Sequence, residues 1–156
     1  TLIHLNKSVM NSAKGEKFIT LFIARYHYTK RKLTYVNAGQ NPPLLYEPSS
    51  QKLIQLASGC VGMGMLDELP FVNEAGIQLD KPAKLICYTD GLVEVIQDSG
   101  IEFGTENLEK EIRNSQSLEN NINTIIKNQK ILEGSASIFD DISILGVEFP
   151  GLNGFT

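Results

Sequence analysis

The sequence is poor in the residues that mark disulfide-rich domains, zinc sites and membrane segments. It has no tryptophan, two cysteines and two histidines in 156 residues. Cys60 and Cys87 lie in different apolar segments without a CxxC spacing, so the sequence indicates neither a zinc site nor a disulfide framework. No apolar run approaches the ~18 residues of a membrane helix, and the amino terminus lacks a signal-peptide pattern. We therefore expect a protein of the reducing cytoplasm, with no membrane contact by this chain.

The sequence also lacks an excess of positive charge. Its 14 lysines and arginines are outnumbered by 18 acidic residues, which gives a net charge of -4. The longest basic run, Lys30–Lys32, falls between two strand-like segments and indicates a solvated turn. Nucleic acid is therefore not expected as a partner. The apolar content of 42% is typical of a globular protein, and we expect one domain over residues 1–149 followed by a polar tail at 150–156.

The order of apolar patterns predicts an α+β fold. Helical spacing predicts helices over residues 2–13, 106–114 and 117–133. Strands are predicted at 18–28, 33–36, 44–46, 53–56, 71–79, 84–88 and 142–147, the run at 84–88 as a buried central strand. The glycine-containing segment 58–64 is expected to be a loop, and it lacks the lysine of a phosphate-binding loop. Because turns of hairpin length link most of the strands, we expect antiparallel sheets with the helices on a sheet face.

Acidic residues flank two of the predicted strands. Asp90 follows the apolar run 84–88 and precedes a glycine, and Asp140 and Asp141 come just before the last strand. Hard divalent cations such as magnesium and manganese take oxygen ligands, and carboxylates at strand ends supply them. Asp-Gly and Asp-Asp pairs are also common in solvated turns. On these residues alone, a metal site and a pair of ordinary turns both stay open.

Four segments in a fixed order carry a resemblance that covers nearly the whole chain. They are FITLF, KLTYVNAGQNPPLLY, LICYTDGLVEVIQDSGIEFGTENL and FDDISILGV. Together they resemble the successive blocks of the SpoIIE/RsbU branch of PPM-type protein phosphatases. The resemblance implies an antiparallel β-sandwich flanked by helices, with a two-metal site at one end of the sheets.

The resemblance also implies roles for particular residues. Asp90 and Asp140 match family aspartates that hold the catalytic metals, and Asp141 is the further candidate ligand beside them. The implied cofactors are two divalent cations, manganese or magnesium, which activate a water for attack on phosphorus without a covalent phosphoenzyme. The implied substrate is a phosphorylated protein, such as an antagonist of an anti-sigma factor, in a bacterial signalling or sigma-factor regulatory pathway.

The chain departs from the family pattern in two ways. Nothing in it matches the DxxGHG segment whose aspartate bridges the two metals, so we expect residues 1–156 to lack the amino-terminal strands and to be inactive or nearly so by themselves. Gln40 stands where relatives usually carry histidine. A rival hypothesis is a non-catalytic, phosphatase-like interaction module. Exposed sheet edges left by missing strands would also favour a homodimer.

Overall fold

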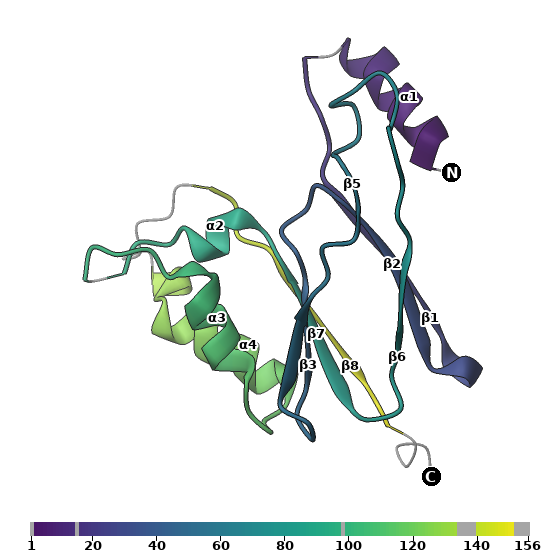
Figure 1. Ribbon diagram of the computed structural model, residues 1–156. Helices are drawn as coiled ribbons and strands as arrows, with labels where there is room; N and C mark the ends of the chain where they lie inside the picture. The colour runs from purple at the N-terminus through teal and green to yellow at the C-terminus, as the bar shows by residue number, and fades with distance from the viewer. Residues whose placement is uncertain (1, 15, 98, 134–139, 152–156) are drawn as a thin grey trace. The chain divides into compact units, whose positions relative to one another are not determined.

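The structure is a computed structural model in which residues 2–14, 16–97, 99–133 and 140–151 are described. The chain divides into two compact units, each with a four-stranded sheet (Figure 1). The first unit contains Thr1–Pro42 and Leu56–Leu79, and the second contains Pro43–Gln55 and Asp80–Thr156. Part of the predicted tail, residues 152–156, lies outside the described residues.

The first unit is a sheet with one helix. Helix α1 spans Leu2–Ala13, as predicted. The strands are β1 (Leu21–His27), β2 (Lys32–Ala38), β5 (Gly59–Cys60) and β6 (Ala75–Gln78). A 3-10 turn, η1 (Tyr28–Lys30), closes the antiparallel hairpin of β1 and β2, whose register pairs Leu21 with Ala38. Strand β6 pairs with β2 on its other side, also antiparallel.

The glycine-containing segment of this unit differs from its prediction. Residues 58–64 are predicted to form a loop, yet β5 pairs with β2 in parallel, with Asn37 opposite Gly59. The backbone N–H of Asn37 donates to the Ser58 carbonyl oxygen at 2.9 Å, which begins this pairing. A two-residue strand has no periodicity of its own, so this pairing depends on the approach of residues far apart in the chain.

Helix α1 is fixed to this segment by one buried amide. The Asn6 side chain is 2% exposed, accepts from the Gly64 N–H at 2.8 Å and donates to the Leu66 carbonyl oxygen at 2.9 Å. Val9 packs with Ala38 and Met63 in the small apolar cluster of this unit. The helix is therefore held by a satisfied buried polar group as well as by apolar contact.

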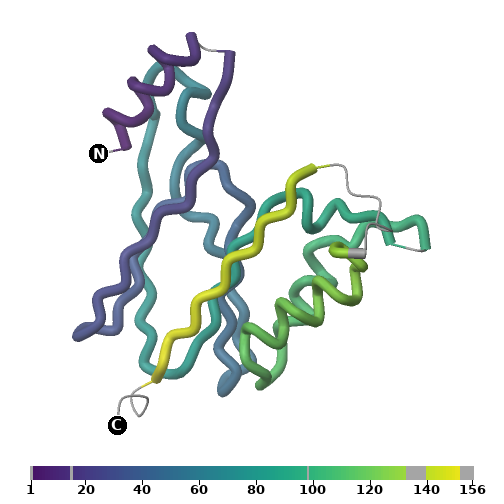
Figure 2. The backbone as a smooth tube through the Cα atoms, turned by 180° about the vertical axis from the view of Figure 1, so that it is seen from behind, coloured from purple at the N-terminus to yellow at the C-terminus, as the bar shows by residue number. Residues whose placement is uncertain are grey.

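The second unit is an antiparallel sheet covered by helices. Its strand order is β4-β3-β7-β8, formed by β3 (Leu44–Glu47), β4 (Lys52–Gln55), β7 (Ala83–Tyr88) and β8 (Ile144–Phe149). The helices are α2 (Asp90–Val93), α3 (Gly104–Ile112) and α4 (Leu118–Asn128), followed by the 3-10 turn η2 (Ile131–Glu133). Figures 1 and 2 show α3 and α4 together on one face of this sheet. Strand β7 is buried and central, as predicted.

The main core lies between this sheet and its helices. Fully buried members come from β3, β7, α2, α3 and α4: Leu44, Ile86, Leu92, Leu108, Ile112 and Ile125. Gly146 of β8 lets α4 approach closely, because a Cβ there would lie 2.6 Å from the Leu118 Cδ2 atom. The helices of this unit are thus placed by apolar burial against one face of β3, β7 and β8.

The predicted α+β class and the hairpins are confirmed, whereas several element boundaries were wrong. The helix predicted to reach residue 133 ends at Asn128, and Lys130 adopts a left-handed backbone (φ 52°) before η2. The short helix α2 was not predicted, because the Asp-Gly pair at its start is typical of a turn. Within the described residues, no helix combines the length and apolar character needed to cross a membrane. Strand β1 pairs only with β2 and β8 only with β7 among these residues; pairing of two copies through such an edge stays a prediction.

Candidate functional site at the end of β7 and β8

The pairing of β7 with β8 brings the predicted acidic segments together. The two strands are antiparallel, and Tyr88 at the end of β7 lies opposite Ile144 at the start of β8. Residues that follow Tyr88 therefore meet residues that precede Ile144 at one end of the sheet. Asp90 belongs to the first of these segments, and Asp140 and Asp141 belong to the second.

Thr89 joins the two segments through three hydrogen bonds. Its backbone N–H donates to the Ser143 carbonyl oxygen at 3.1 Å. Its Oγ1 hydroxyl donates to the Asp141 carbonyl oxygen at 2.9 Å and accepts from the Ser143 N–H at 2.9 Å. These bonds extend the β7–β8 contact beyond the last paired residues and fix the position of the Asp141 backbone.

Gly91 allows a close approach between the two segments. A Cβ at this position would lie 2.7 Å from the Asp141 carbonyl oxygen and 2.9 Å from the Asp140 carbonyl oxygen. Both distances are shorter than a carbon–oxygen contact tolerates, so the segment with Asp140 and Asp141 can lie here only against a residue without a side chain. The glycine after Asp90 is therefore required by packing.

The three residues are exposed, and the carboxylates of Asp90 and Asp140 each accept a hydrogen bond from the next residue's amide. Asp90, Asp140 and Asp141 are all exposed residues. One oxygen of Asp90 accepts from the Gly91 N–H at 3.1 Å, and one oxygen of Asp140 accepts from the Asp141 N–H at 2.7 Å. In the described part of the chain, no lysine or arginine forms an ion pair with any of the three. The corner is thus an anionic, solvent-accessible set of oxygen atoms.

These findings place the predicted site residues without testing their chemistry. Asp90 and the Asp140–Asp141 pair meet at one corner of the second unit, and their roles as catalytic or metal-binding residues stay predictions. Across residues 2–14, 16–97, 99–133 and 140–151, no group of three or more His, Cys, Asp or Glu side chains is arranged to hold a metal ion. Sequence reasoning missed Thr89, because a threonine after a strand carries no signal of a cross-strand bond.

Gln40 lies in a loop of the first unit that Asn37 organises. The Asn37 side chain accepts from the Gln40 N–H at 2.8 Å and donates to the Gln40 carbonyl oxygen at 2.9 Å. The Thr20 hydroxyl donates to the Gln40 side-chain oxygen at 2.8 Å. Asn37 therefore shapes this loop through hydrogen bonds to the backbone three residues further along, as asparagine side chains commonly do in turns.

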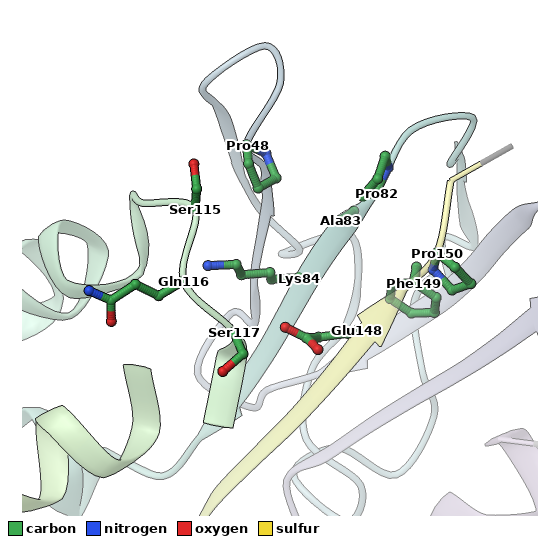
Figure 3. A pocket seen from close by; sticks show the side chains of 10 residues that line it. All are labelled: Pro48, Pro82, Ala83, Lys84, Ser115, Gln116, Ser117, Glu148, Phe149 and Pro150. Carbon is green, nitrogen blue, oxygen red and sulfur yellow. The ribbon is translucent and has the colours of Figure 1, made fainter. Parts of the chain in front are cut away.

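A second polar centre lies at the opposite end of β7. Lys84 is 5% exposed, and its Nζ donates to the Asn114 carbonyl oxygen at 3.0 Å and to Asn121 Oδ1 at 2.9 Å. Burial lowers the pKa of this lysine, and the nearby Glu148 carboxylate acts in the opposite direction. Figure 3 shows Lys84 reaching toward the segment that carries Gln116, with Glu148 on the neighbouring strand.

The cavity beside Lys84 has a volume of about 430 Å³. It is lined by Pro48, Pro82, Ala83, Lys84, Ser115, Gln116, Ser117, Glu148, Phe149 and Pro150. Both charged groups in it are already engaged, because Glu148 accepts from the Leu118 N–H at the start of α4. We interpret this end of β7 as the anchor of the α3–α4 connection.

The sequence matches one family over nearly its whole length. A family model described as Stage II sporulation protein E (SpoIIE) matches residues 1–150. Protein IcfG of Synechocystis sp. is 30% identical over 132 residues, which cover 83% of this chain and 20% of IcfG. Phosphoserine phosphatase RsbP of Bacillus subtilis is 25% identical over 91 residues, which cover 58% of this chain and 22% of RsbP. The chain thus spans about a fifth of the length of these curated relatives.

Solved structures with the same fold are phosphatase domains. The SiaA-PP2C domain of Pseudomonas aeruginosa has a TM-score of 0.68 at 18% identity, over 83% of this chain and 51% of that domain. The phosphatase domain of SpoIIE from Bacillus subtilis, presoaked with manganese, has a TM-score of 0.60 at 14% identity, over 92% of this chain and 62% of that one. At these identities the likeness establishes the fold, which is that of PP2C-type phosphatase domains.

Proposed function

The chain belongs to the SpoIIE family, and we propose that it forms part of a metal-dependent protein serine/threonine phosphatase of the bacterial cytoplasm. The observation that carries the proposal is the meeting of Asp90 with the segment of Asp140 and Asp141 at one end of β7 and β8. Two acidic segments separated by about fifty residues need not meet in a fold that uses them only as turns. Because the chain spans a fraction of its curated relatives, the activity of the whole protein is part of this proposal.

The donor set at this corner fits divalent cations. Carboxylate oxygens are hard ligands of the kind that magnesium and manganese prefer. Asp90 and Asp140 would hold the cations, with Asp141 as a further ligand. When bound, two such cations stabilise negative charge on a phosphoryl group and lower the pKa of a water molecule. The described residues offer part of a site, because no group of three potential ligands is arranged among them. We therefore propose that residues 1–156 by themselves bind cations weakly and are inactive or nearly so.

The residues of this chain would serve mainly to orient ligands. The amides of Gly91 and Asp141 each hold one carboxylate oxygen, of Asp90 and Asp140 respectively, and so limit rotation of these side chains. No described residue hydrogen-bonds to the second oxygen of either carboxylate, so those oxygens are open to a cation. Exposure of the corner also suits a protein-borne phosphate, which cannot enter a closed pocket.

The proposed substrate is a phosphoserine or phosphothreonine of another protein. An antagonist of an anti-sigma factor is the partner that we propose, in a signalling or sigma-factor regulatory pathway. The family membership and the name of RsbP, a phosphoserine phosphatase, support this class of substrate.

The test is manganese-dependent hydrolysis of a phosphoserine peptide. A longer form of the protein that carries a DxxGHG segment should release phosphate with manganese and lose the activity when the metal is chelated. Asp90→Asn and Asp140→Asn should each reduce the rate by about 100-fold or more, because each removes a ligand. Glu119→Gln is the control, since it removes an exposed carboxylate at the start of α4, where activity should be unchanged.

Two outcomes would count against the proposal. If the longer form binds its partner but releases no phosphate with any divalent cation, the non-catalytic interaction module is favoured. If Asp90→Asn and Asp140→Asn retain full activity, the catalytic centre lies elsewhere.

A further inference from the structure

Thr89 occupies a helix-capping position but does not cap the helix. It is the residue before α2 and has the extended backbone (φ -90°, ψ 160°) that suits a capping residue. A threonine there usually accepts a hydrogen bond from an N–H of the first helical turn. The Thr89 side chain makes no such bond. Its hydroxyl instead bonds to the Asp141 carbonyl oxygen and the Ser143 N–H.

The Thr89 hydroxyl links the segment of Asp90 to the segment of Asp140 and Asp141. The regular β7–β8 pairing ends at Tyr88 and Ile144, and the Thr89 N–H adds one backbone bond to Ser143. The chain before Ser143 has left the strand, so the hydroxyl bond to Asp141 reaches beyond the sheet. Because Thr89 directly precedes Asp90, one residue holds both ligand-bearing segments.

We propose that Thr89 is a positioning residue of the metal site, whose hydroxyl sets the placement of the Asp140–Asp141 backbone relative to Asp90. The inference rests on the proposed function. The hydroxyl has no ligand role of its own, since both of its bonds go to the protein backbone. It acts on cation affinity through the position of the carboxylates, as outer partners of metal ligands do.

The experiment compares variants of Thr89 in the chain of residues 1–156. Thr89→Val removes the hydroxyl at nearly constant volume, and Thr89→Ser keeps the hydroxyl without the methyl group. Manganese is added stepwise, and paramagnetic broadening of the Gly91 and Ser143 amide resonances is followed, which detects weak binding without any turnover. Hydrogen exchange of the Ser143 amide is measured without metal.

The valine variant should need about tenfold more manganese than the wild type for the same broadening. Its Ser143 amide should exchange faster, because its hydrogen-bond acceptor is gone. The serine variant should match the wild type in both measurements, which a role in apolar packing of the methyl group would not produce. If the valine variant does not fold, Thr89→Ala removes the same hydroxyl without introducing a larger apolar group.

Asp90→Asn separates the failure of this inference from failure of the proposed function. If Asp90→Asn weakens the manganese response while Thr89→Val leaves it unchanged, the positioning role is overturned and the metal site stands. Equal losses in Thr89→Val and Thr89→Ser also overturn it, because the hydroxyl would not be the cause. If neither Asp90→Asn nor Thr89→Val alters the response, the metal site and the inference both fall.

Discussion

Gly91→Ala should displace the acidic segment that lies against it. The new Cβ would stand 2.7 Å from the Asp141 carbonyl oxygen, whereas an ordinary carbon–oxygen contact is about 3.3 Å or longer. The backbone must therefore move by roughly 0.6 Å, and the atoms in the way belong to the main chain, which cannot rotate aside. Overpacking of this kind costs about 1–3 kcal/mol. For a chain of this size, we expect a fall in melting temperature of about 4–8 °C for a loss of about 2 kcal/mol.

The same variant should weaken manganese binding by more than its loss of stability explains. Gly146→Ala is the matched control. Its Cβ would meet the Leu118 and Ile122 side chains at 2.6 and 2.9 Å, so it also overpacks the unit, but it lies inside β8 and does not touch the acidic segments. Both variants should lower the melting temperature, measured by thermal unfolding. Only Gly91→Ala should raise the manganese concentration needed for half-maximal amide broadening, by about tenfold. Equal manganese responses in the two variants, or a Gly91→Ala protein with unchanged stability, would refute the packing argument.

Two further predictions concern the buried Lys84 and the half-buried Cys87 of the second unit. Lys84→Met should lower the free energy of unfolding, measured in urea, by about 1–3 kcal/mol, since the oxygens of Asn114 and Asn121 lose their donor. Lys110→Met, at an exposed position, is the control and should change that free energy by no more than about 0.5 kcal/mol. Equal free energies of unfolding in the two variants would contradict the anchoring role. Burial raises the pKa of the Cys87 thiol to about 11. At pH 8 the thiolate fraction of Cys87 should be roughly a few hundred times smaller than that of a free thiol of pKa about 8.5. Because a thiolate of higher pKa is also more nucleophilic, its alkylation should be slower by about tenfold or more. The stability that Cys87 contributes should be present below pH 8.5 and be lost as the pH rises through about 11. Fast labelling of Cys87 in the folded chain would contradict this, and an alanine at this position should reduce the loss of stability between about pH 8.5 and 11.

The sequence predicted local elements better than it predicted pairing. The apolar spacing of residues 2–13 defines α1, and the run at 84–88 identifies the central strand, because both signals are contained within the element itself. The parallel pairing of β5 was missed, since a strand of two residues, one of them a glycine, carries no pattern. The same limit applies to the candidate site. Asp90 and the Asp140–Asp141 pair were visible as acidic ends of strands, whereas their meeting depends on the register that sets Tyr88 opposite Ile144.

The backbone at this corner is held by contacts that involve no cation. Asp90, Asp140 and Asp141 carry like charges on neighbouring segments, and their exposure to water keeps any repulsion between them small. The uncharged Thr89 hydroxyl holds the backbone there, and Gly91 leaves room for it to lie close. A structural zinc site differs, because its ligands hold the fold together only when the metal is present. Under the proposed function, cation binding at Asp90 and Asp140 would therefore add to a preset backbone, and removal of the cation should lower the activity far more than the melting temperature.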